Sequence, residues 1–167
     1  NTHSLGPDSH TLGKYSAIIE EFKADMGIYS FLNEFISSGV LTDTDKKEII
    51  ISELTDSFLK AKPVLTQAHR VRTVMILNRM FKTKAIVLDS KNRLIFDYDK
   101  VIETAKLMMS ELIELQLSGS VSKAEDYINK YFKWTKEMQI VADIKKKSSK
   151  LLNGKTTAPL SKELRKI

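Results

Sequence analysis

Apolar residues that recur at helical spacing constrain this chain more than any other feature of its sequence. Between Ser16 and Gly39 they fall three or four residues apart, which places them on one face of a helix. The same spacing appears in five further stretches of the 167-residue chain, at residues 43–62, 66–81, 99–117, 122–134 and 135–153. The pattern therefore predicts a mainly α fold of about six helices.

One stretch has a different pattern. Residues 85–88 and 93–96 are short apolar runs, and four polar residues separate them. Two β-type runs joined by a short polar segment are typical of a β-hairpin. We expect a single helical domain over residues 1–154 with one small hairpin, followed by a basic tail over residues 155–167.

Local signals predict where several helices begin and end. Thr66 is a good N-cap for the third helix, and Ser122 with Glu125 has the form of a capping box. Gly39 and Gly119 are expected to end the helices before them, because glycine readily adopts the left-handed conformation of a helix C-terminus.

The composition excludes several classes of protein. The chain has no Cys, so disulfides and thiolate metal ligands are impossible and a reducing compartment is the expectation. The first ten residues lack the charged and then apolar layout of a signal peptide. The apolar runs are too short to span a bilayer. We therefore expect a cytoplasmic protein with no membrane partner.

The net charge is concentrated at one end of the chain. Residues 145–167 hold eight Lys or Arg and one acid, a formal charge of +7 that exceeds the +6 of the whole chain. A basic chain suggests a nucleic-acid partner. Because the body of the chain is close to neutral and the charge belongs to a tail without interleaved aromatic residues, we expect no specific nucleic-acid binding.

Three segments carry side chains suited to metal chemistry, and they hold His3, the pair Glu20 and Glu21, and His69. His and Glu are common zinc ligands, and catalytic zinc sites use three protein ligands and a water. By pattern alone each residue also has an ordinary explanation. The two glutamates could be solvated helix carboxylates, His69 a hydrogen-bonded core residue and His3 a loop residue.

Together the three segments resemble the dipeptidyl peptidase III family of metallopeptidases, and more closely its shorter bacterial relatives. Residues 2–7, Thr-His-Ser-Leu-Gly-Pro, are similar to the end of the family's His-Glu-x-x-His helix and the turn after it, with Ser4 in place of the usual Gly. Residues 20–25, Glu-Glu-Phe-Lys-Ala-Asp, are similar to its Glu-Glu-x-(Arg/Lys)-Ala-(Glu/Asp) signature. Residues 67–69, Gln-Ala-His, are similar to a third family segment.

The resemblance implies that the chain is the C-terminal helical part of a zinc-peptidase catalytic domain. It implies that His3 and Glu21 are zinc ligands, that Glu20 and Asp25 lie beside the ligands, and that His69 is a catalytic residue near the substrate. The family's first His and general-base Glu would precede this chain. We therefore expect zinc-dependent hydrolysis of a peptide substrate in a longer parent protein, whose N-terminal portion is a partner of this chain. This fragment alone is expected to be inactive and to bind zinc weakly or not at all.

A second interpretation stays open, in which the chain is a non-catalytic helical interaction module with a basic tail. Some bacterial relatives in the same family carry a Nudix-type hydrolase domain ahead of the peptidase-like part. The chain could then be the C-terminal domain of a Nudix hydrolase, although the Glu-rich Nudix box does not occur in these 167 residues.

Overall fold

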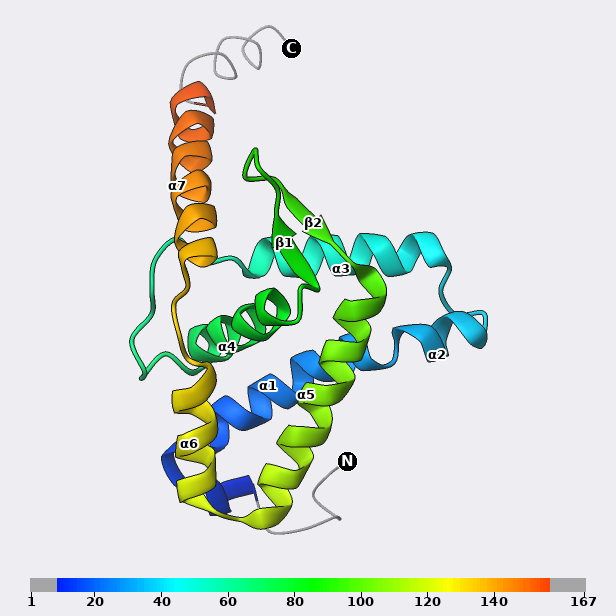
Figure 1. Ribbon diagram of the computed structural model, residues 1–167, viewed down its shortest axis with the longest axis vertical. Helices are drawn as coiled ribbons and strands as arrows, with labels where there is room; N and C mark the ends of the chain where they lie inside the picture. The colour runs from blue at the N-terminus through cyan, green and yellow to red at the C-terminus, as the bar shows by residue number, and fades with distance from the viewer. Residues whose placement is uncertain (1–8, 157–167) are drawn as a thin grey trace, which may run out of the picture.

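The computed structural model describes residues 9–156, and within them the side chains of residues 11–148. The described residues form a short 3-10 helix, seven α-helices and one two-stranded hairpin (Figure 1). In chain order these are η2 (Ser9–Tyr15), α1 (Ser16–Ser30), α2 (Leu32–Ser37), α3 (Asp43–Ser57), α4 (Ala68–Lys82), β1 (Ile86–Leu88), β2 (Leu94–Phe96), α5 (Tyr98–Ser118), α6 (Val121–Tyr131) and α7 (Lys136–Thr156). The predicted mainly α class with one hairpin is confirmed.

Helix α1 lies at the centre of the core, between α4 and α5. The apolar residues on its inner face repeat at helical spacing and are almost fully buried, among them Ile19, Phe22 and Met26. The long α5 contributes a continuous apolar stripe on the facing side, with Val101, Ile102, Ala105, Met108 and Leu112 all buried. Burial of apolar area stabilises a fold by about 25 cal/mol per Å², so this contact contributes to the stability of the core. The α1–α4 and α1–α5 contacts therefore fix where the polar residues of α1 point.

The first predicted helix is divided in two, α1 and α2. Phe31 leaves the helical conformation between α1 and α2, with φ −105° and ψ 6°. Beyond the break, Leu32 is buried while Phe31 and Phe35 are exposed. Apolar periodicity continues across the break, because the turn changes the direction of the helix without changing the spacing of its residues.

Two predicted helix starts were displaced. Helix α4 begins at Ala68 with Gln67, not Thr66, at the N-cap. Helix α6 is capped by Ser120, whose hydroxyl accepts a hydrogen bond from the Lys123 amide at 3.3 Å. The predicted capping box at Ser122 does not form, because the chain becomes helical directly after the left-handed Gly119, which has φ 57°. Gly119 does end α5 as predicted.

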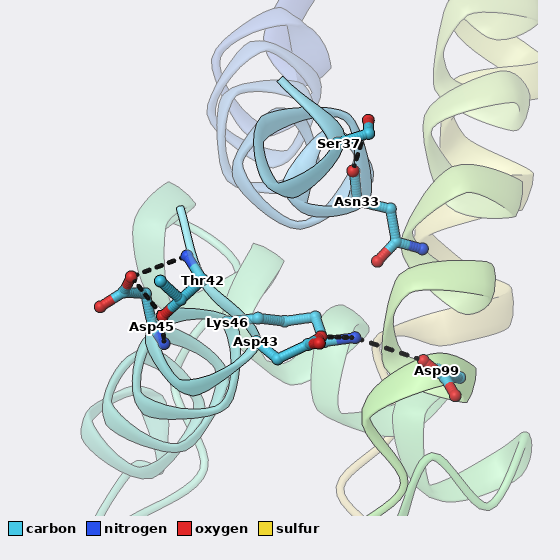
Figure 2. Close-up of polar contacts among 7 residues, drawn as sticks. All are labelled: Asn33, Ser37, Thr42, Asp43, Asp45, Lys46 and Asp99. Atoms are coloured by element: carbon cyan, nitrogen blue, oxygen red, sulfur yellow. Dashed lines mark hydrogen bonds and ion pairs between the residues drawn. The ribbon is translucent and has the colours of Figure 1, made fainter. Parts of the chain in front are cut away.

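The N-terminus of α3 has a capping box that the sequence analysis did not anticipate (Figure 2). The Thr42 hydroxyl accepts from the Asp45 amide at 3.2 Å, and the Thr42 amide donates to Asp45 Oδ2 at 2.8 Å. One residue further, the Lys46 ammonium lies 3.3 Å from Asp43 and 3.6 Å from Asp99. Lys46 thus joins the first turn of α3 to the first turn of α5.

The hairpin forms as predicted, and Ile86 pairs with Phe96 in an antiparallel register. Helix α7 is anchored by buried residues near its start, Met138, Val141 and Ala142, and its far end projects from the body (Figure 1). Residues 157–167 of the predicted basic tail lie outside the described residues. Among the helices that the structure describes, none combines the length and apolar character needed to cross a membrane.

Candidate functional site

The crossing of α1 and α4 brings Glu21 and His69 together, although they are 48 positions apart in the chain. Glu21 Oε2 lies 3.2 Å from His69 Nδ1. Both side chains reach solvent, since 39% of the Glu21 side chain and 70% of the His69 side chain are exposed. A carboxylate and an imidazole thus meet at the edge of the core, where a ligand could reach both.

Each helix contributes a second charged residue to the same place. On α1, Asp25 follows Glu21 by one helical turn, and on α4, Arg72 follows His69 by nearly one turn, so each pair shares a helix face. Arg72 Nη1 donates a hydrogen bond to Asp25 Oδ2, and Arg72 Nε lies 3.9 Å from Glu21 Oε2. We call these four residues the α1–α4 cluster.

The electrostatics of the α1–α4 cluster differ between its two acids. Burial raises the pKa of the Asp25 carboxyl above its usual range, and the neighbouring Arg72 opposes that rise without cancelling it. Asp25 is satisfied by its hydrogen bond from Arg72. Within the described part of the chain no hydrogen bond reaches the Glu21 carboxylate, whose contacts with His69 and Arg72 are ion-pair contacts. Glu21 is therefore the acid of the cluster that is open to a further cation.

Glu20 points to a different neighbour. Its Oε1 accepts hydrogen bonds from Gln116 Nε2 at 3.0 Å and from Lys23 Nζ at 3.2 Å. Consecutive residues on a helix are about 100° apart, so Glu20 faces α5 while Glu21 faces α4. The structure brings Glu21, Asp25 and His69 together and leaves Glu20 outside the cluster. His3 lies outside the described residues.

The sequence analysis did not single out Arg72, although its spacing contained a signal. On a helix, residues three apart share a face, so the His-x-x-Arg spacing of His69 and Arg72 could have indicated a shared site. What the spacing could not show is that Asp25 lies opposite Arg72, because that contact depends on how α1 and α4 cross.

A cavity of about 200 Å³ adjoins the cluster between α1, α3 and α4. Asp25 and Arg72 form part of its wall, together with Tyr29 and Glu53. Burial is the main cause that raises the pKa of the Tyr29 phenol, and the charge of Glu53 adds to it. Tyr29 therefore stays a neutral hydroxyl group at every ordinary pH.

The described residues do not make up a complete metal site. Among them, no group of three or more His, Cys, Asp or Glu side chains is placed to hold a metal ion. Glu21 suits the role of a single oxygen ligand, since its carboxylate is partly exposed and accepts no hydrogen bond from the residues that the structure describes. Asp25 suits it less, since Arg72 already occupies its carboxylate.

A second polar network lies at the junction of α4, α5 and α6. Arg79 is buried, donates to Glu111 Oε1 at 3.0 Å and also donates to the Tyr131 hydroxyl. Tyr127 donates to Glu111 Oε2 at 2.9 Å. A cavity of about 400 Å³ opens beside these tyrosines, yet it is away from the α1–α4 cluster. Two tyrosines of α6 thus form hydrogen bonds with the two members of a partly buried ion pair.

We compared the chain with family models and with proteins of known structure. No family model matches the chain. By structure, the chain matches dipeptidyl peptidase III from Caldithrix abyssi with a TM-score of 0.73 and 19% identity, over 82% of this chain and 26% of that one. It matches the dipeptidyl-peptidase III of Corallococcus sp. strain EGB with a TM-score of 0.69 and 22% identity, over 77% and 24% of the two chains. The chain therefore has a dipeptidyl peptidase III-like fold, of which it spans about a quarter.

By sequence, the chain is similar to a particular curated protein, Nudix hydrolase 3 of Arabidopsis thaliana. The two are 25% identical over an alignment of 142 residues, which covers 77% of this chain and 18% of the plant protein. The chain thus spans less than a fifth of that relative's length.

Proposed function

We propose that this chain forms one wall of the active site of a zinc-dependent peptidase, as part of a longer protein. The observation that carries the proposal is the 3.2 Å contact between Glu21 and His69, which the fold creates from two distant segments. The dipeptidyl peptidase III-like fold supports it, since the structurally similar proteins are named as peptidases. The substrate class is a peptide, and the remainder of the longer protein is the partner that completes the site.

In this proposal Glu21 holds zinc together with His3 and a histidine from the preceding part of the protein. Bound zinc in such a site polarises a carbonyl group and lowers the pKa of its bound water to about 7. His69 has most of its ring in solvent and can reach a substrate oxygen on which negative charge develops. Arg72 and Asp25 orient Glu21 from the protein side. The described residues supply one ligand of the set, so the isolated chain should bind zinc weakly.

The test uses the intact protein that contains these residues, with zinc content and peptide hydrolysis measured on the same preparations. Glu21→Ala should lose the bound zinc. His69→Ala should keep the zinc and lower the rate of hydrolysis about 10²–10³-fold, the usual effect of removing one oxyanion donor. Glu48→Ala, which removes an exposed glutamate of α3, is the matched control and should change neither quantity. Unchanged zinc affinity in Glu21→Ala would rule out its assignment as a ligand.

The similarity to Nudix hydrolase 3 favours a second candidate, a non-catalytic helical interaction module attached to a different hydrolase. In that case the intact protein would contain no zinc that depends on Glu21, and it would not hydrolyse peptides. The same zinc and activity measurements therefore separate the two candidates.

A further inference from the structure

Arg72 makes different contacts with Asp25 and Glu21, the two acids of α1 that face it. Its Nη1 donates a hydrogen bond to Asp25, whereas its Nε stays 3.9 Å from Glu21. That Nε atom is buried and has no hydrogen-bond partner among the described residues. A buried N–H without a partner is costly, and a guanidinium group readily binds a carboxylate through two parallel hydrogen bonds. Arg72 therefore has an unused donor close to a carboxylate that it does not reach.

The contact with Asp25 explains why Arg72 stops short of Glu21. Asp25 is the more buried of the two acids, with 32% of its side chain exposed. An ionised carboxylate in that position depends more strongly on a direct cationic partner than the better solvated Glu21 does. The two acids are one helical turn apart, so a guanidinium group that is bound to Asp25 is directed away from Glu21.

We propose that Asp25 is a positioning residue that acts through Arg72. By holding Arg72 at ion-pair distance from Glu21, Asp25 keeps the Glu21 carboxylate in place and available to His69 and to a metal cation. Without the Asp25 charge, Arg72 moves onto Glu21, forms the two hydrogen bonds that are absent here, and displaces His69. The geometric part of this inference stands without zinc, and the part that concerns zinc rests on the proposed function.

The first experiment measures the coupling between Arg72 and Glu21 in this chain, in the absence of metal. Urea unfolding of Arg72→Met, Glu21→Gln and the double variant gives the coupling, and the cycle is repeated in an Asp25→Asn background. We expect the coupling to rise on removal of Asp25, by about tenfold in the unfolding equilibrium constant, the scale of one charge-assisted hydrogen bond. Equal coupling in both backgrounds would overturn the proposal. Asp25→Ser serves as a second background if Asp25→Asn unfolds.

The second experiment measures zinc affinity in the intact protein. Asp25→Asn should weaken zinc binding about tenfold, because Arg72 then occupies Glu21 with a charge-assisted hydrogen bond. Adding Arg72→Met to Asp25→Asn should restore most of the affinity, whereas adding Arg70→Met, at an exposed arginine of the same helix, should not. A structural or ligand role for Asp25 predicts no such rescue, so its absence would contradict the proposal. Absence of zinc in the unaltered protein would refute the proposed function and leave the unfolding cycle as the test of the inference.

Discussion

The α1–α4 cluster and the capped N-terminus of α3 both combine carboxylates with a neighbouring cation, yet their acids behave in opposite ways. At α3, hydrogen bonds from the Thr42 side chain and main chain lower the pKa of Asp45 (Figure 2). In the cluster, burial raises the pKa of Asp25 despite its bond to Arg72. The same chemical group is thus stabilised in its charged form by a local turn and destabilised by tertiary burial.

The two sites also differ in whether they leave a polar group available to a ligand. The Thr42–Asp45 box satisfies helix amides within four residues and faces solvent, so it contributes to folding and leaves nothing open for a ligand. The cluster brings together charged residues from two helices, and no side chain or amide of residues 11–148 donates a hydrogen bond to Glu21. Groups left incompletely satisfied at the edge of a core are typical of binding sites.

The largest expected effect comes from removing the cation of the cluster. Arg72→Met leaves Asp25 without its partner, and we expect a loss of about 1–3 kcal/mol in the free energy of unfolding, below the usual range for a fully buried pair. Urea unfolding at neutral pH measures the loss. Arg70→Met is the control, and it should change the stability by less than about 0.5 kcal/mol because Arg70 is exposed. Equal losses in the two variants would show that the cluster is no different from the helix surface.

A smaller loss is expected at α3. Thr42→Ala removes the hydroxyl that accepts from the Asp45 amide, and the typical cost of such an N-cap change is about 1 kcal/mol. Thr44→Ala, at an exposed threonine within the first turn of the same helix, is the matched control. If the two threonine variants had equal stability in urea, the capping box would not contribute to folding.

The smallest effect, and the one that tests the comparison most directly, is the dependence of stability on pH. The folded pKa of Asp45 lies below its ordinary value of 3.8, so its stabilising contribution is present above that value and is lost as the pH falls through the folded pKa. The folded pKa of Asp25 lies above 3.8, so its contribution is present below 3.8 and is lost as the pH rises through the folded pKa.

The measurement is urea unfolding between about pH 3 and pH 6, the range in which carboxyl groups titrate. Relative to the unaltered chain, Asp25→Asn should gain stability as the pH rises, and Asp45→Asn should lose it. Slopes of the same sign in the two variants would contradict the assignment of opposite environments.

Much of the fold could be predicted because its signals are local. Apolar spacing identified the helical segments, two short apolar runs joined by a polar segment identified the hairpin, and Gly119 identified the end of α5. The predictions failed where the local structure depends on contacts with residues that are distant in the sequence. At Phe31 the helix breaks and Leu32 packs into the core. Beside α6, Glu125 accepts a hydrogen bond from the Tyr15 hydroxyl at 2.7 Å in place of the predicted capping contact with Ser122.

For the candidate site, the sequence by itself determined which residue types are present and which of them share a helix face. It put Glu21 and Asp25 on one side of α1, and His69 and Arg72 on one side of α4. Only the tertiary structure decided that these two faces meet, that Glu20 instead binds Gln116, and that Arg72 bonds Asp25 in preference to Glu21. The physical reason is that spacing along a helix follows from its 3.6-residue period, whereas contact and desolvation depend on how the packed core places one helix against another.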